Sequence, residues 1–354
     1  MKASSDPFRT VCTLPPAPLT MDLSTHVLTL GSCFADGVGT HLYHALPSGH
    51  VCVNPYGPVF NPLSIASAID LLMAGAEVIL NGGDDDSAFA RFDAARYVFC
   101  GNDHLWHSYL HASSFSSATQ SDCLRRIRST LLPAMRLMAQ ADVVSVTWGT
   151  ADAWFLKDRP DMVVGNCHKQ PATCFQPRRL TIAEIVEQWT AVIDRLHRLR
   201  PEAIVLLTVS PYRYAGRGLH ASTLTKAVLH LAAEALMQQF AFVHYFPAYE
   251  MVMDDLRDYR FYDRDMLHPS AQATAYVFDR LKTWCFSDAL LSYSQNKAVL
   301  LAARAHRPIV GEGEAYAAFQ AKLKEKEAAF AQAYAQWEEE PIPLEPVLQH
   351  GDVH

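Results

Sequence analysis

Two short segments of the chain carry side chains suited to nucleophilic catalysis. The first, Gly31 to Ala35, places a hydroxyl and a thiol next to each other in a turn that follows an apolar run. A helix that begins at this turn points its positive end at Cys33, which predicts a lowered thiol pKa and a stronger nucleophile. The alternative is that Cys33 is a small buried packing residue.

The second segment contains a carboxylate three residues before an imidazole, at Asp265 and His268. In this arrangement the carboxylate holds one ring nitrogen, and the other nitrogen faces a nucleophile as its general base. The chain has 16 histidines, and a lone histidine is more often structural. The catalytic interpretation therefore depends on all the polar loops occurring together and in order.

Two polar stretches between these segments supply candidate donors and pocket residues. The first is dense in turn formers, which can aim an amide into a cleft, although a plain turn has the same composition. The second holds side chains that can donate to an oxyanion. The candidates in both are Asn54, Tyr56, Gly57, Trp148, Asn166 and His168. Cys167 and His168 with Cys174 resemble part of a zinc motif, but no second pair at ligand spacing accompanies them, so we expect no metal.

These segments fall between apolar runs that predict the strands of one sheet. The runs cover residues 27–30, 50–53, 142–147, 204–209 and 242–246. Helical patterns separate them, over residues 36–46, 61–80, 121–140, 182–200, 222–240 and 270–284. Thr181 and Glu184 form a capping box that starts one of these helices. Strands that alternate with long helices predict a parallel sheet covered on both faces, with the chemistry on loops after the strands' carboxyl ends.

Residues 81–115 interrupt the alternation and contain aromatic, strand-like pieces, which predict an inserted β-rich segment. His107 belongs to a set of polar-tipped aromatic residues there, which either line a substrate pocket or pack within a half-buried hairpin. Arg260 lies shortly before Asp265 and either binds an anionic substrate group or braces the Asp265 loop.

The C-terminal part, residues 289–354, is predicted to be a helical extension. Tyr316, Leu323, Phe330 and Trp337 recur every seven residues and form one apolar stripe on a long helix. This stripe either docks on the preceding domain or pairs with a second copy of the chain as a homodimer. The charged, proline-containing end from residue 338 is expected to be flexible.

Composition narrows the class of protein. Of the 354 residues, 50% are hydrophobic and 19% are charged, which is ordinary for a globular protein. The net charge of −7 argues against general nucleic-acid binding, which usually requires a basic surplus. The N-terminus lacks a signal-peptide pattern, and no apolar run approaches the roughly 20 residues of a membrane span. We therefore expect a cytoplasmic protein whose cysteines are reduced.

The order of these motifs resembles that of the SGNH or GDSL hydrolases, and more narrowly the GSCFA family, which is named for the pentapeptide at residues 31–35. Further segments that fit this family are Asn54 to Gly57, Asn166 to Lys169, Thr208 to Pro211 and Arg257 to Tyr262. The resemblance covers roughly residues 25–285 and implies a flavodoxin-like three-layer αβα sandwich. The implied parts are an N-terminal arm (1–24), a catalytic domain (25–288) and the C-terminal extension.

The resemblance also implies acyl transfer through a covalent acyl-enzyme. The serine of the usual Gly-Asp-Ser turn corresponds to Cys33 rather than Ser32. A capsule-biosynthesis family with a similar fold also carries cysteine there and is linked to acyl transfer. His268, oriented by Asp265, is then expected to deprotonate Cys33, with Ser32 as the second choice of nucleophile.

One departure from the SGNH pattern concerns the oxyanion. The usual asparagine of that pattern is replaced by Ala151, so the predicted donors are the Cys33 amide, the Gly57 amide and Asn166. The expected enzyme is an esterase or acyltransferase without a tightly bound cofactor. Acyl-coenzyme A is a candidate donor, and water, a small molecule or a glycan is the acceptor. The alternative, which the loss at Ala151 favours, is a non-catalytic module that binds a glycan or a partner.

Overall fold

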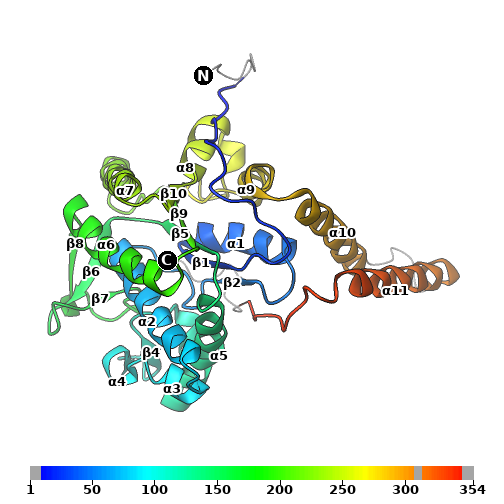
Figure 1. The fold of residues 1–354 in the computed structure, drawn as a ribbon. Helices are drawn as coiled ribbons and strands as arrows, with labels where there is room; N and C mark the ends of the chain where they lie inside the picture. Colours follow the sequence, from blue (N-terminus) through cyan, green and yellow to red (C-terminus); the bar gives the residue numbers. More distant parts are fainter. Residues whose placement is uncertain (1–8, 307–312, 345–354) are drawn as a thin grey trace.

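A central parallel sheet organises the structure, a computed structural model that describes residues 9–306 and 313–344 (Figure 1). Its strands are β1 (Val27–Gly31), β2 (Val51–Val53), β5 (Val143–Trp148), β9 (Ile204–Val209) and β10 (Val243–Tyr245). They lie in the order β10-β9-β5-β1-β2, and all neighbouring pairs are parallel. These are the five apolar runs predicted as strands, since β-branched and apolar residues suit a strand buried on both faces.

Helices cover both faces of the sheet and make a three-layer sandwich (Figure 1). One layer consists of α2 (Pro62–Leu80), α5 (Gln120–Met138), α6 (Ile182–Leu199) and α7 (Leu219–Gln239). The other consists of α1 (Cys33–Ala45), the short α8 (Ala248–Glu250) and α9 (Ala271–Cys285). Strand residues alternate between the two cores, so Leu28 and Leu30 belong to the first and Val27 to the second. The predicted α/β class is confirmed.

Two predicted helix starts bear on the site and its support. α1 begins at Cys33, three residues earlier than expected, so the thiol lies in the first helical turn. α6 begins with the predicted capping box, in which the Thr181 hydroxyl accepts from the Glu184 amide and the Glu184 carboxylate accepts from the Thr181 amide.

In the described part of the chain, one helix, α2, is long enough and apolar enough to cross a membrane, judged by length and composition alone. Its Ile65 and Leu72 are fully buried in the core between the sheet, α5 and α6. Its Asp70 and Glu77 both pair with Arg195 of α6. Packing inside the sandwich therefore accounts for its apolar composition.

Two stretches between the core elements form small additional structures. The predicted insertion contains a hairpin of β3 (Val98–Cys100) and β4 (Trp106–Ser108), together with α3 (Asp85–Phe89), α4 (Ala94–Tyr97) and η1 (Ser113–Phe115). A second sheet that the sequence did not predict follows β5, in the order β7-β6-β8. Its elements are β6 (Asp152–Leu156), β7 (Val163–Val164), η2 (Ala172–Cys174) and β8 (Phe175–Arg179). β8 contains Pro177 and three polar residues, and β6 begins with Asp152, so neither strand is an apolar run throughout its length.

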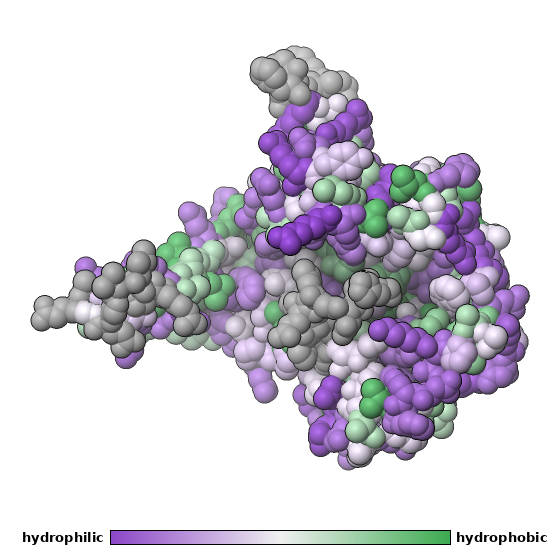
Figure 2. Space-filling view, turned by 180° about the vertical axis from the view of Figure 1, so that it is seen from behind, coloured by the Kyte–Doolittle hydropathy of each residue, from purple (hydrophilic) through white to green (hydrophobic). Residues whose placement is uncertain are grey.

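The C-terminal extension consists of α10 (Asp288–Ala305) and α11 (Glu314–Tyr334), which stand off the body as an arm (Figure 1, Figure 2). Phe330 and Tyr334 of the apolar stripe pack on Tyr293 of α10. The chain then returns to the body, where the Glu339 amide donates to the Ser48 carbonyl at 2.9 Å. Ile342 and Leu344 also pack against the body, the flexibility of this end stays a prediction, and residues 345–354 lie outside the described residues.

Candidate active site

The predicted catalytic segments follow strands at one edge of the sheet. β1 and β5 are neighbours although β2 follows β1 in the chain, so the strand order reverses between them. Ligands of such sheets bind outside the carboxyl ends of the strands at this point. Ser32 follows β1 here, and its amide donates to the Thr147 carbonyl of β5 at 3.2 Å. The turn that carries Ser32 and Cys33 therefore lies where this architecture places ligands.

Gly31 allows β1 to pass into α1 directly against β5. Its φ is +148°, and a Cβ at this position would lie 2.2 Å from the Thr147 carbonyl oxygen. No larger residue fits beside that carbonyl without moving the backbone. Glycine is therefore required for the turn that presents the two candidate nucleophiles.

Asn54 fixes the same turn from the loop after β2. Its Oδ1 accepts from the Gly31 amide at 2.7 Å, and its side-chain amide donates to Asp36 in the first turns of α1. Burial raises the pKa of Asp36 to about 7, against the hydrogen bond from Asn54. Asn54 is 3% exposed, so in this structure it positions the turn, and the predicted substrate contact is not open to it.

Cys33 and Ser32 differ in access. Ser32 is 1% exposed, and its buried hydroxyl has no hydrogen-bond partner within the described part of the chain. Cys33 is partly exposed. Burial and the charge of Asp36 raise the pKa of Cys33 to about 12, although the amides of Phe34 and Cys33 act in the opposite direction. The predicted lowering of the thiol pKa is wrong, because burial outweighs the helix N-terminus.

Asp265 and His268 form the carboxylate–imidazole pair that their spacing predicts. Asp265 Oδ1 accepts from the amides of Leu267 and His268, each at 2.9 Å, and Oδ2 bonds to Nδ1 of the His268 ring. Partial burial opposes ionisation, but these hydrogen bonds lower the pKa of Asp265 to about 2. The carboxylate is thus ionised at neutral pH and holds the ring so that Nε2 is left for a nucleophile.

Tyr212, in the loop after β9, connects this pair with α1. Its ring lies against the His268 ring, with 4.1 Å between the centroids. Burial raises the pKa of Tyr212, and the charges of Asp265 and Cys33 act in the same direction, so both groups lie near one phenol. α1 also packs on α9, the helix after the His268 loop, through a close contact at Gly37. The His268 loop and the first turn of α1 are therefore held in one region.

Lys226 of α7 is a further site residue, which the sequence did not predict. Its ammonium donates to the Gly149 carbonyl at 2.5 Å and to the Ser210 carbonyl at 2.6 Å. It thereby ties the loop after β5 to the loop after β9. Burial lowers the pKa of Lys226 to about 7, the charge of Arg213 acts in the same direction, and the charge of Cys33 opposes both.

The sequence did carry a signal for Lys226. It falls on the face of α7 that also carries Leu229, Ala233 and Leu236, all of which are buried. Lysine is almost never fully buried unless it is paired, and Lys226 is only 2% exposed. A lone lysine within a helical apolar stripe therefore indicates a buried cation with a specific partner.

Of the two predicted oxyanion donors outside α1, the Gly57 amide donates elsewhere, and Asn166 is tied to its own loop through its side-chain oxygen. The Gly57 amide donates to the Asn54 carbonyl at 2.7 Å within a tight turn. Asn166 Oδ1 accepts from the His168 amide at 2.8 Å, within its own loop. The prediction that the Gly57 amide is free for an oxyanion is thus wrong in this structure. The amides of Cys33 and Phe34 remain as candidate donors, whereas the Ala35 amide already donates to the Ser32 carbonyl at 2.8 Å.

Two predicted pocket residues belong to the core instead. Tyr56 and Trp148 are each 0% exposed. The Tyr56 hydroxyl donates to the Ala68 carbonyl of α2 at 3.0 Å, and Trp148 packs edge-on against Trp189 with 5.3 Å between ring centroids. Their aromatic rings stabilise the layer beneath the site, and the predicted substrate contacts are wrong for this structure.

The remaining pocket candidates lie apart from Cys33 in two groups. His107 of the insertion and His168 of the loop after β7 are each 4% exposed, and their rings stack with 4.6 Å between centroids. Burial lowers the pKa of His168 to about 4, and its Nε2 lies 2.8 Å from the Ser108 carbonyl. Arg260 is exposed on η4 (Tyr259–Phe261), which follows the single-turn π-helix η3 (Met251–Asp255). Its substrate role stays a prediction.

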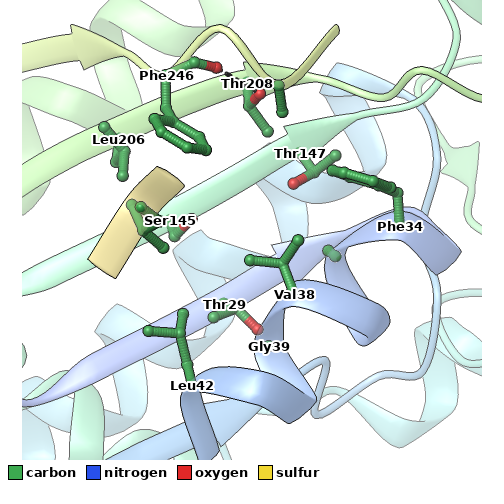
Figure 3. A pocket seen from close by; sticks show the side chains of 13 residues that line it. Thr29, Phe34, Val38, Gly39, Leu42, Ser145, Thr147, Leu206, Thr208 and Phe246 are labelled. Carbon is green, nitrogen blue, oxygen red and sulfur yellow. Dashed lines mark hydrogen bonds between the residues drawn. The ribbon is translucent and has the colours of Figure 1, made fainter. Parts of the chain in front are cut away.

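A small cavity lies between α1 and the sheet (Figure 3). Thr29, Ser145 and Thr147 point into it from neighbouring strands, opposite Val38 and Leu42 of α1 (Figure 3). Its volume is about 20 Å³, which is room for about one water molecule. An acyl chain does not fit there, so this cavity is not the binding site of an acyl group attached to Cys33.

Fold and site together define a doubly wound α/β protein with a Ser–Cys turn after its first strand and an Asp–His pair before α9. The chain belongs to the GSCFA family, which matches residues 26–281. No curated protein matches the sequence. The matched region begins one residue before β1 and ends within α9, so it contains all the loops described above and leaves out α10 and α11.

Proposed function

We propose that the chain is an acyl-transferring enzyme of the SGNH type that forms a covalent acyl-enzyme on Cys33. The observation that carries this proposal is the Asp265–His268 pair, whose ring lies against Tyr212, a residue that also feels the charge of Cys33. Family membership supports the loops as a set but does not by itself supply a reaction. The substrates are esters or thioesters, because their carbonyl carbon is the target of such a nucleophile.

The raised thiol pKa determines how the first step proceeds. With a pKa of about 12, Cys33 is almost wholly protonated at neutral pH, so attack is coupled to proton transfer. His268 Nε2 accepts the thiol proton while Sγ bonds to the carbonyl carbon. The first amides of α1 stabilise the negative oxygen that forms. Collapse then breaks the bond to the alkoxide or thiolate leaving group, which takes the proton back from His268.

The second step transfers the acyl group from sulfur to an acceptor. Water or an alcohol loses its proton to His268 and attacks the thioacyl carbonyl, which regenerates the Cys33 thiol. Thioesters exchange readily with a cysteine, so acyl-coenzyme A is a suitable donor, and a small molecule or a glycan is a suitable acceptor. We expect this reaction to take place in the cytoplasm without a resident cofactor.

Intact-protein mass spectrometry tests the proposal directly. The full chain is exposed briefly to an activated ester or to acetyl-coenzyme A, and any adduct is mapped by peptide. An adduct on Cys33 that is lost in Cys33→Ala and His268→Ala but kept in Ser32→Ala supports the thiol mechanism. An adduct on Ser32 would make the enzyme a serine esterase and reject Cys33 as nucleophile.

A non-catalytic module that binds a glycan or partner is the second candidate. Two observations favour it: the high pKa of the Cys33 thiol, and the engagement of the Gly57 amide by Asn54. A folded protein that forms no adduct on Cys33 or Ser32 with either reagent would select this reading.

A further inference from the structure

A second cluster of titratable side chains lies at the amino ends of the strands, away from the candidate active site. His26 immediately precedes β1, and His50 immediately precedes β2. Glu339 reaches the same place from the segment after α11. One ring nitrogen of each histidine and one carboxylate oxygen lie within 4.8 Å of one another. Two imidazoles and a carboxylate are a donor set that divalent zinc uses in proteins.

The ring nitrogens of this cluster are short of partners. His50 is 3% exposed at its side chain, and His26 is 13% exposed. His26 Nε2 and His50 Nδ1 are buried without a hydrogen-bond partner among the residues that the structure describes. The Glu339 Oε1 atom lies 3.5 Å from His26 Nε2 and 3.7 Å from His50 Nε2, beyond good hydrogen-bond length. The Glu339 carboxylate therefore faces Nε2 of both rings without a good hydrogen bond to either.

A second carboxylate supports His26 from behind. Asp142 Oδ2 accepts from the His26 backbone amide at 2.8 Å and lies 3.8 Å from Nδ1 of the same ring. Arg200 lies 3.6 Å from the other oxygen of Asp142 and balances its charge. A metal-bound histidine usually has a carboxylate near the ring nitrogen that does not bind the metal. Asp142 occupies this position beside Nδ1 of His26, while Nε2 faces Glu339.

The returning chain is fixed where it delivers Glu339. The Glu339 amide donates to the Ser48 carbonyl at 2.9 Å, and the neighbouring Glu338 carboxylate accepts from the Tyr293 hydroxyl at 2.5 Å. Gly49 leaves room for this approach, because a Cβ there would lie 2.5 Å from the Glu339 Cβ. The Glu339 carboxylate is thus held near the two histidines by its own backbone contact and by the neighbouring Glu338.

We propose that His26, His50 and Glu339 bind a divalent metal ion of the zinc class, with water as a fourth ligand. The two rings are stacked at 4.1 Å with 15° between their planes. Binding therefore turns one ring about its Cβ–Cγ bond, so that both lone pairs meet the ion at about 2.1 Å. The ion joins the C-terminal extension to the sheet edge, as structural zinc sites do for other small elements.

This site differs from the metal motif considered in the sequence. The expectation of no metal rested on the absence of a second ligand pair near Cys167 and Cys174. Here the ligands come from three distant segments, which only the fold brings together.

Cobalt(II) binding tests the proposal, because its visible absorption distinguishes nitrogen and oxygen ligands from thiolates. The protein is the chelator-treated full chain with Cys100→Ser and Cys174→Ser, which removes the exposed thiols. Titration is done at about pH 8, where free imidazoles are neutral. We expect one equivalent of cobalt without a thiolate charge-transfer band, displaced by zinc, and a rise in the melting temperature with added metal.

Glu339→Gln and Glu340→Gln are the matched variants, since the two glutamates are adjacent and exposed. Glu339→Gln keeps the shape of the side chain and the backbone contact to Ser48, and should weaken cobalt binding more than tenfold. Glu340→Gln should bind as the parent does. Equal binding in both variants, or no binding by the folded parent, overturns the proposal. A melting temperature that depends on pH and on Glu339 but not on metal would assign the cluster to proton binding instead.

Discussion

Within the described residues, two carboxylate–imidazole pairs join side chains three or four positions apart in the sequence, and they differ in their surroundings. Asp265 and His268 are three residues apart, and Asp103 and His107 are four apart. The second pair even has a serine, since Ser116 Oγ lies 2.6 Å from His107 Nδ1 while His107 Nε2 lies 3.0 Å from Asp103 Oδ1. Residue types and contacts alone would therefore select the second set as a catalytic triad.

The difference lies in the ring nitrogens and in access. Both nitrogens of His107 are used, and its side chain is 4% exposed beneath the stacked His168 ring. His268 uses Nδ1 for Asp265, and its side chain is 26% exposed in a loop at the carboxyl edge of the sheet. A general base requires a free nitrogen within reach of the substrate, and of these two pairs the Asp265–His268 pair offers it. The pair in the insertion holds a hairpin together, whereas the pair at the sheet edge remains free to react.

His268→Ala against His107→Ala tests this comparison most strongly. Loss of a general base typically slows a reaction about 10²–10⁴-fold, so we expect the acylation rate of Cys33 to fall by that factor in His268→Ala. His107→Ala should acylate at close to the parental rate. The measurement is the time course of adduct formation by mass spectrometry, with circular dichroism to verify folding. An equal loss of rate in two folded variants would contradict the assignment of roles.

Lys226→Met tests whether the arrangement of the loops after β5 and β9 affects the acylation of Cys33. The substitution leaves the buried Gly149 and Ser210 carbonyls without their donor, at a cost of about 1–3 kcal/mol for each. We expect a loss of about 2 kcal/mol or more in the free energy of unfolding, and about tenfold slower acylation because the loops shift. Lys297→Met, which removes a donor to the Leu46 carbonyl on α1's far end, should leave acylation unchanged.

The pH dependence of the Lys226 effect has a defined sign. The pKa of Lys226 is about 7 in the folded protein against an ordinary value of 10.5. Between these values the unfolded chain binds more protons, so this group adds stability as pH rises from about 7 towards 10. The unfolding free energy of the parent should therefore rise relative to Lys226→Met over that range in denaturant titrations. A constant difference would show that Lys226 is charged throughout.

Ser116→Ala tests whether the Asp103–His107 pair has a structural role and no catalytic one. It leaves the buried His107 Nδ1 without its partner, which should lower the free energy of unfolding by about 1–2 kcal/mol. Acylation of Cys33 should not change, and peptide mapping of the parent should find no ester on Ser116. Labelling of Ser116 would show that the insertion carries a second nucleophile after all.

The sequence predicted the five strands, the covering helices and the Asp265–His268 pair, because each depends on local spacing or on apolar runs. It did not predict the raised pKa of Cys33, which depends on how deeply α1 packs and on Asp36. The sequence predicted substrate contacts for Tyr56 and Trp148, because it does not distinguish an aromatic residue of the core from one in a pocket wall. The approach of Glu339 to His26 was equally invisible, because it depends on the path of the chain after α11.

Asp265→Asn and Asp103→Asn give the smallest expected effect on stability and compare the two carboxylates. The pKa of Asp265 is about 2 in the folded protein, below its ordinary value of 3.8, so its contribution is present above about pH 4 and is lost as pH falls through 2. Its side chain is 42% exposed, which limits this contribution to about 1 kcal/mol at most. The unfolding free energies of the parent and Asp265→Asn should therefore converge between about pH 4 and pH 2.

Hydrogen bonding to His107 also lowers the pKa of Asp103, so Asp103→Asn should show the same direction of pH dependence. The two variants should separate in acylation at neutral pH. Asp265→Asn forces His268 to change its hydrogen bonding and should slow acylation, because the ring tautomer that leaves Nε2 as a base is no longer favoured. Asp103→Asn should acylate as the parent does. Slowed acylation in Asp103→Asn alone would reverse the assignment, and it would place the reacting base in the insertion.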